Sequence, residues 1–182
     1  MDQQQKWEKQ ARKIVFGLRK GVLIYCILVM ALLFLYNLGI LEKVDKFLPA
    51  AVAAEDGGSY TCDIRIIGEA TRYPVKEFLC GHSYRGSGEV TVYANGQRLA
   101  IVSLDGGDPD HAGGYNYPAT CVLRRDLESA FAETDVQRVF PEQESQRCII
   151  VAPACNAEGA IALLKKQGLP EAWQTAFQWA LQ

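Results

Sequence analysis

The longest apolar stretch of the chain runs from Gly21 to Leu41, 21 residues without a charged side chain. A helix rises about 1.5 Å per residue, so this stretch is about 30 Å long as a helix and matches the hydrocarbon core of a bilayer. A buried core helix is the alternative, but such helices keep a polar face over this length. The pattern therefore predicts one transmembrane helix at residues 21–41.

Beyond the span the apolar pattern breaks. Glu42 and Lys46 have the i,i+4 spacing of a helical ion pair, and Pro49 ends the helical pattern. The small and flexible sequence AAVAAEDGGS follows. We therefore expect a juxtamembrane helix end and linker at residues 42–58 and a folded domain at residues 59–182.

Within that domain the clearest local pattern is a β-hairpin. Two apolar runs, Glu89–Ala94 and Arg98–Leu104, flank Asn95-Gly96, a dipeptide that tolerates the positive φ angles of a type I′ turn. The segment Tyr60–Ile67 is rich in β-branched residues and predicts another strand. Residues 105–118, DGGDPDHAGGYNYP, are rich in Gly, Asp and Pro and predict a loop.

The C-terminal third predicts mainly helices. In LRRDLESAFAE the apolar residues with helical spacing are Leu123, Leu127, Ala130 and Phe131. RCIIVAP predicts a short strand, and Asn156 is a candidate N-cap for a helix that ends at Gly168. Pro170 opens a final helix, whose apolar face holds Trp173, Phe177 and Ala180. The order of elements predicts an α+β fold, in which C-terminal helices pack on an antiparallel β-hairpin sheet.

Basic residues concentrate before the span. The first twenty residues hold six basic and two acidic side chains, and the basic membrane flank is Arg12, Lys13, Arg19 and Lys20. Because Lys and Arg are retained in the cytoplasm, residues 1–20 are predicted to be a basic cytoplasmic tail and the domain to lie outside. Residues 51–53 have the A-x-A pattern of a cleavage site. The apolar run is longer than that of a signal peptide, so we expect an uncleaved signal-anchor.

The rest of the chain is acidic. Of 19 Lys and Arg and 21 Asp and Glu, 13 basic and 19 acidic side chains remain after residue 20, a net charge of −6. Nucleic acids and anionic lipid surfaces attract positive charge, so the composition argues against both as partners of the domain.

Six cysteines are present, and Cys26 lies within the span. The other five are on the side predicted to be external: Cys62, Cys80, Cys121, Cys148 and Cys155. There is no C-x-x-C metal motif, and an oxidising compartment favours disulfides. We expect two disulfides and one remaining thiol, with all fifteen arrangements open. No Asn begins a glycosylation sequon, which favours a bacterial inner-membrane protein with a periplasmic domain.

The stretch CGHSYRGSG places Cys80, His82 and Ser83 close together. A hydrolase elbow requires G-x-S-x-G, but Arg85 occupies the second glycine position. Residues i and i+2 of an extended segment point to opposite faces, so His82 is badly placed to activate Cys80 as a nucleophile. The stretch predicts a loop in which Cys80 is disulfide-bonded.

The acidic loop is the second chemical candidate, with Asp105, Asp108, Asp110 and His111 as weak candidate metal ligands. An EF-hand that begins at Asp108 requires a bidentate glutamate where Ala119 stands, which excludes that motif. A looser calcium or zinc site and a solvated loop both stay open at this point, and we expect no resident cofactor.

These features predict a non-catalytic, single-pass membrane protein. We expect its external domain to bind other envelope proteins, or itself, in a secretion, conjugation or surface-exclusion complex, and we identify no small-molecule substrate. The alternative is an envelope enzyme or metal-binding protein that uses His82, His111 and the Asp105–Asp110 loop.

Overall fold

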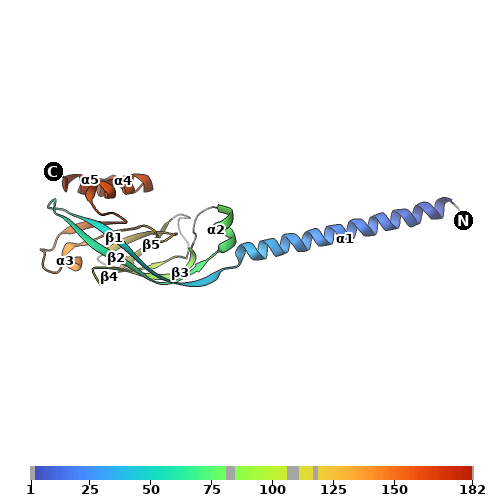
Figure 1. The fold of residues 1–182 in the computed structure, drawn as a ribbon, viewed down its shortest axis with the longest axis horizontal. Coiled ribbons are helices and arrows are strands. Elements are labelled where there is room, and N and C mark those ends of the chain that lie inside the picture. Colours follow the sequence, from blue (N-terminus) through green and yellow to red (C-terminus); the bar gives the residue numbers. More distant parts are fainter. Residues whose placement is uncertain (1–2, 81–84, 106–110, 117–118, 182) are drawn as a thin grey trace.

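A long N-terminal helix precedes a sheet domain. The computed structural model describes residues 3–80, 85–105, 111–116 and 119–181. Helix α1 covers Gln3–Asn37, and its segment Lys13–Asn37 is the one described helix that is long and apolar enough to cross a membrane, with a mean hydropathy of 2.2. α1 projects away from the domain (Figure 1). It ends at Asn37, four residues before the predicted end of the span.

Within the described residues, eight strands form one antiparallel sheet of two meanders. The first meander is β1 (Ile40–Ala54), β2 (Ser59–Arg72), β3 (Arg85–Ala94) and β4 (Gln97–Ser103). The second is β5 (His111–Asn116), β6 (Ala119–Arg124), β7 (Ala130–Asp135) and β8 (Arg147–Ala152). β1 pairs with β8, so the strand order is β4-β3-β2-β1-β8-β7-β6-β5. The remaining helices are α2 (Pro74–Cys80), α3 (Val136–Val139), α4 (Ala157–Gln167) and α5 (Glu171–Trp179).

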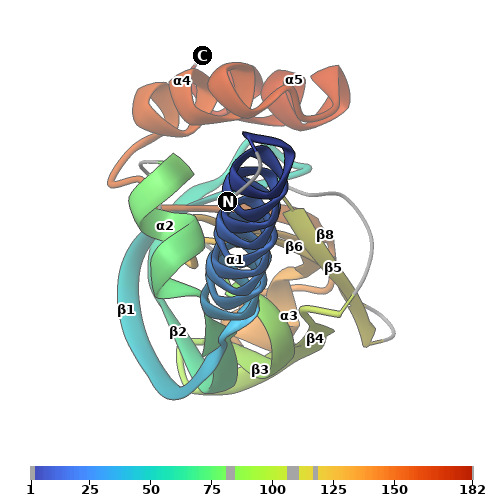
Figure 2. The same ribbon diagram turned by 90° about the vertical axis from the view of Figure 1, so that its right-hand side faces the viewer.

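The sheet curls until its two end strands, β4 and β5, lie close to each other (Figure 2). Two glycines permit the close approach of β2 and β3 in this curl. A Cβ added to Gly68 would lie 2.3 Å from the carbonyl oxygen of Glu89. A Cβ added to Gly88, whose φ is +128°, would lie 2.2 Å from the carbonyl oxygen of Glu69. Only glycine fits both positions, and such positions increase the coiling of a sheet.

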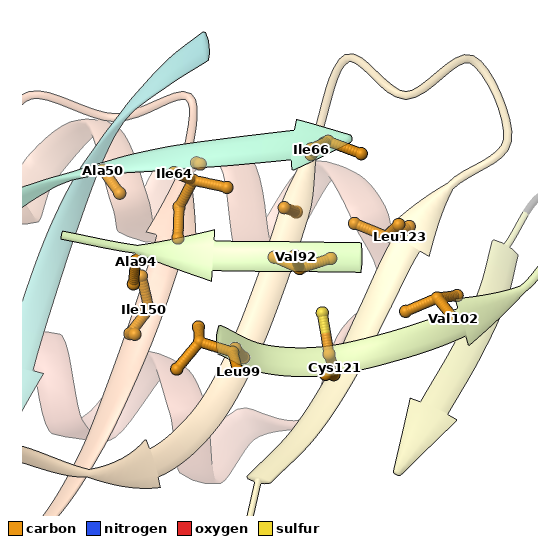
Figure 3. Close-up of a cluster of buried hydrophobic side chains, with 14 of the residues drawn as sticks. Ala50, Ile64, Ile66, Val92, Ala94, Leu99, Val102, Cys121, Leu123 and Ile150 are labelled. Atoms are coloured by element: carbon orange, nitrogen blue, oxygen red, sulfur yellow. The ribbon is translucent and has the colours of Figure 1, made fainter. Parts of the chain in front are cut away.

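The inner face of the curled sheet encloses the main core. Side chains from seven strands converge there. Figure 3 shows Ala50, Ile64, Ile66, Val92, Ala94, Leu99, Val102, Cys121, Leu123 and Ile150. Successive residues of a strand point to opposite faces, so the core residues of a strand alternate with residues that face outward. Burial of these apolar groups is the main stabilising contribution to the domain.

A helical hairpin covers part of the outer face. Trp173 and Phe177 of α5 pack against Phe131 and the outer residues of β1 and β8. The predicted helix ends are confirmed: Asn156 Oδ1 accepts a hydrogen bond from the Gly159 N–H at 2.8 Å, and Gly168 ends α4 with a φ of 65°. The antiparallel sheet and the C-terminal helices packed on it are therefore as predicted.

The predicted hairpin is confirmed as well. β3 and β4 flank Asn95 and Gly96, which have φ angles of 47° and 78°. The predicted strand at 60–67 lies within β2, and the strand predicted from RCIIVAP is β8.

The predicted juxtamembrane helix end and linker at residues 42–58 is wrong. Residues 40–54 form β1, which pairs with β2 over fourteen residues, and only Leu38 and Gly39 separate it from α1. One i,i+4 ion pair contributes only a few tenths of a kcal/mol to a helical turn. β2 begins directly after Gly57 and Gly58, and its pairing with β1 outweighs that local helical preference.

Two further segments differ from the prediction. Residues 123–133, predicted as a helix, form the end of β6, a turn and the start of β7. Leu127 has a φ of 59° and donates its N–H to the carbonyl of Arg124 at 2.8 Å, so its burial comes from a turn and not from a helix face. Within the predicted loop 105–118, residues 111–116 form β5, while 106–110 and 117–118 lie outside the described residues.

Gly68→Ala is expected to lower the free energy of unfolding by about 1–3 kcal/mol, because the added methyl forces β2 and β3 apart. The neighbouring Glu69→Ala, at an exposed position, is the matched control and should change it by less than about 0.5 kcal/mol. Denaturant unfolding of the full-length protein in detergent measures both, and equal stability of the two variants would contradict the close approach of the strands.

Candidate functional site

Three large side chains form a row across the outer face of β1, β2 and β3. The strand register places Phe47 opposite Arg65, and Arg65 opposite Tyr93. Their neighbours Ile64 and Val92 point into the core, so these three residues point outward. We call Phe47, Arg65 and Tyr93 the outer row.

An ion pair holds the centre of the outer row. Arg65 donates from Nε and Nη2 to the two carboxylate oxygens of Asp45 at 2.9 and 2.8 Å. Its guanidinium carbon lies 4.7 Å from the centroid of the Phe47 ring. Hydrogen bonding from Arg65 holds the pKa of Asp45 below its usual range. Both groups are about half exposed, so the pair adds little stability and its main effect is to orient the guanidinium beside the ring.

The outer row lines a shallow groove of about 500 Å³. Its walls are Phe47, Asp63, Arg65, Ile67, Tyr93 and the Asn95-Gly96 turn. The Phe47 side chain is 64% exposed, which is costly for an aromatic ring in water. An exposed aromatic ring beside an arginine is a composition that protein–protein interfaces favour.

The burial of β1 explains why this face is open. From Leu41 to Pro49 its odd-numbered residues are exposed, whereas Ala50–Ala54 are all buried. The change occurs where α4 and α5 cover the sheet, because Ala51 and Ala53 pack against those helices. The helical hairpin covers the β1–β8–β7 part of the outer face and leaves the outer row uncovered.

A second hollow, of about 270 Å³, lies between α5 and the sheet, with the half-exposed Trp179 at its edge. Glu133 of β7 makes two polar contacts beside it, the first to β8 and the second to α5. Arg147 Nε lies 2.7 Å from Glu133 Oε1, and Trp173 Nε1 donates to Glu133 Oε2 at 3.1 Å. The hollow is therefore part of the helix–sheet interface.

The predicted chemical residues do not form a described site. His82, Asp108 and Asp110 lie outside the described residues, His111 starts β5 opposite Arg124, and Asp105 is exposed after β4. Within the described part of the chain, no three His, Cys, Asp or Glu side chains gather as metal ligands do. Among the described residues, the outer row is therefore the candidate site.

The predicted disulfides are not formed among the described cysteines, where Cys62, Cys121, Cys148 and Cys155 are free thiols. Desolvation raises the pKa of Cys62, Cys121 and Cys148 to about 12 each. The carboxylate of Asp63 contributes to the shift at Cys62. Because the thiolate is the reactive form, these three behave as small apolar core residues.

Cys80 also departs from its prediction. It is the last residue of α2, whereas the sequence predicts a loop there, and the loop residues 81–84 lie outside the described residues. The local sequence PVKEFLC supports a short helix because it begins with proline and carries Glu77 in its first turn.

The outer row is not apparent from the sequence, because residues 42–58, which include Phe47, are interpreted there as a helix end and linker. A different feature of the same segment indicates a strand: Val44, Leu48, Ala50, Val52 and Ala54 are all apolar and even-numbered. A strand with these residues inside places Phe47 outside. Arg65 and Tyr93 carry no signal of their own, since only the register of three strands brings them together.

No family model, curated protein or solved structure matches the chain. The fold and the outer row are therefore the basis for the functional proposal.

In the folded protein at pH 8, Cys155 should react with iodoacetamide while Cys62, Cys121 and Cys148 stay unmodified. With a pKa near 12, about one thiol in 10⁴ is ionised at this pH, and burial also excludes the reagent. Labelling of the three should become complete after unfolding.

Peptide mapping without reducing agent measures both states. A Cys155→Ser variant is the control that removes the native-state label from the peptide containing residue 155. A disulfide-linked peptide containing Cys62, Cys121 or Cys148 would contradict the structure.

Proposed function

We propose that the chain is a single-pass protein of a bacterial inner membrane, with α1 as an uncleaved signal-anchor, the N-terminus in the cytoplasm and the domain in the periplasm. The large apolar side chains of α1 are exposed, and a bilayer would cover them. Lys13, Arg19 and Lys20 are exposed at its N-terminal side, whereas its last turn holds no basic residue. Buried thiols suit an oxidising compartment, because a thiol that does not ionise reacts slowly with oxidants.

The periplasmic domain is a non-catalytic module that binds another envelope protein. The outer row carries this proposal, because it is the exposed aromatic and arginine surface that α4 and α5 leave uncovered. Truncation of an interface aromatic or arginine often costs more than truncation of other contact residues. A secretion, conjugation or surface-exclusion complex is the setting that fits an anchored module of this size.

The shape of the groove indicates the chemistry of the partner. Phe47 and Ile67 offer apolar contact, and Arg65 is held rigid by Asp45. A partner segment that places an apolar side chain against Phe47 and Ile67 would desolvate the exposed Phe47 ring beside Arg65. Because the guanidinium is already oriented, binding loses little side-chain entropy.

A reporter enzyme that is active only outside the cytoplasm should be active when fused after Gln182. Reversing the positive charge before the span is the sharper test, since the orientation of α1 in the membrane depends on that charge. Replacing Lys13, Arg19 and Lys20 by Glu should reduce reporter activity, while the same change at the distal Lys165 and Lys166 should not. An inactive Gln182 fusion, or a mature chain that starts near Ala54, would contradict the anchor.

Phe47→Ala should weaken the affinity for a co-purifying partner about 30-fold, because losing a central aromatic contact costs about 2 kcal/mol. Recovery of that partner from detergent-solubilised membranes should fall accordingly. Trp179→Ala is the matched control, since that ring is 55% exposed but lies at the other hollow. Quantitative mass spectrometry of proteins that co-purify with the tagged full-length chain compares the two variants. A second, untagged copy of the chain would count as the partner if Phe47→Ala lowers its recovery. Equal recovery with both variants would contradict a role for the outer row.

The alternative, an enzyme or metal-binding protein that uses His82, His111 and Asp108, predicts a different pattern. Alanine at those three positions would then abolish the cellular function in a normally folded chain, while Phe47→Ala would preserve it. The binding module predicts the reverse.

A further inference from the structure

Helix α2 lies at the junction between α1 and the sheet. It follows β2 directly, and it contacts the C-terminal end of α1 (Figures 1 and 2). The ammonium group of Lys76 lies 5.1 Å from the ring centroid of Tyr36 in α1 and 4.3 Å from that of Tyr73. α2 is therefore held at the level where α1 ends.

The exposed side of α2 is apolar. Phe78 is 86% exposed and Leu79 is 65% exposed, while the Glu77 side chain is only 10% exposed and bonds to Arg72 at 2.6 Å. A short helix on the surface of a water-soluble domain has the opposite arrangement, with its charged residue outside. Two apolar residues at the start of β1 are exposed as well: Ile40 at 53% and Leu41 at 65%.

The junction has little freedom to move. A Cβ on Gly39 would lie 2.3 Å from Thr71 Cγ2 and 3.2 Å from the Tyr73 ring, and a Cβ on Gly86 would lie 2.3 Å from that ring. The ring of Tyr73 therefore fits closely between the α1–β1 connection and β3. With only Leu38 and Gly39 between α1 and β1, the position of α2 relative to the end of α1 is set by packing.

The length of α1 places the exposed apolar residues of α2 and early β1 at the boundary of the membrane. From Gly21, which follows Lys20, to Asn37 the helix has 17 residues, or about 25 Å, whereas the hydrocarbon core is about 30 Å thick. Residues beyond the end of α1 must then span the last part of the outer leaflet, about 5 Å. Leu38, Ile40 and Leu41 follow the end of α1 and are in the right place to do so. Phe78 and Leu79 belong to α2, which contacts that end of α1.

We infer that Ile40, Leu41, Phe78 and Leu79 form a membrane foot that inserts into the headgroup–acyl boundary of the outer leaflet. The inference rests on the proposed anchoring of α1. Helices at this boundary place their apolar face about 5–10 Å deep, and tyrosines such as Tyr36 and Tyr73 favour the same level. Lys76 extends from its apolar stem toward the headgroups. The domain then stands on the membrane in one orientation.

Photo-crosslinking of the full-length chain in liposomes tests the foot. Benzoyl-phenylalanine is placed, one site at a time, at Phe78, Phe34 and Phe47, three native phenylalanines that are 86%, 68% and 64% exposed, so the substitution is tolerated at each. The liposomes contain phosphatidylethanolamine with an alkyne on the acyl chain. Phe34 lies within α1, and Phe47 lies on β1 about 23 Å beyond Ile40.

The expected result is lipid adducts at positions 34 and 78 and at least ten-fold fewer at 47. Adducts at 34 with none at 78 would overturn the foot while the anchor stands. The absence of adducts at 34 would overturn the proposed anchor itself, and with it the foot. Protein adducts in place of lipid adducts at 78, in membranes from the native host, would show that α2 contacts another chain and would also overturn the foot.

Discussion

The pairing of β1 on both of its sides is the constraint on which the rest of the structure depends. β1 pairs with β2 over fourteen residues and with β8 over four, so it is the strand that unites the two meanders. A central strand must pair its backbone groups on both sides, since an unpaired buried N–H or carbonyl is costly. β1 is also the strand attached to α1, so the same pairing connects the sheet to the apolar helix.

The register of β1 also divides the molecule into its two surfaces. A shift by one residue would move Val44 and Val52 out of the core and bring Phe47 into it. With the observed register, the even-numbered residues pack inside the curled sheet and the odd-numbered residues face outward. The helical hairpin then covers Ala51 and Ala53, and the exposed remainder is the outer row. The candidate binding surface is thus a consequence of how far α4 and α5 extend over the sheet.

The absence of a linker between α1 and β1 gives the proposed topology a geometric consequence. A flexible linker would let the domain rotate freely above a membrane. The two-residue connection and the close fit of the Tyr73 ring remove that freedom. In the proposed topology, Phe47 stands at most about 23 Å beyond Ile40, because the two residues are seven positions apart along the strand. A partner would meet the outer row within that distance of Ile40.

Local patterns predicted the elements whose stability comes from nearby residues. The Asn95-Gly96 turn, the Asn156 cap and the apolar length of α1 each depend on a few neighbours along the chain, and each is present in the structure. The apolar face of the last helix was also readable, because Trp173 and Phe177 are one helical turn apart. The interactions that stabilise these features all lie within a few residues along the chain.

The sequence by itself therefore determined the long apolar helix, the β3–β4 hairpin and the C-terminal helical hairpin. Only the tertiary structure decided that residues 40–54, 119–124 and 130–135 are strands, because these strands depend on pairing with other strands, at separations of up to 32 residues for Ile40 with Arg72 and 22 for Ala130 with Ala152. It also decided that Cys62, Cys121 and Cys148 are buried free thiols, since spacing along a sequence carries no information on which strands enclose a side chain. The outer row belongs to the same class: Phe47, Arg65 and Tyr93 are separated by 18 and 28 residues, and only the register of three strands brings them together.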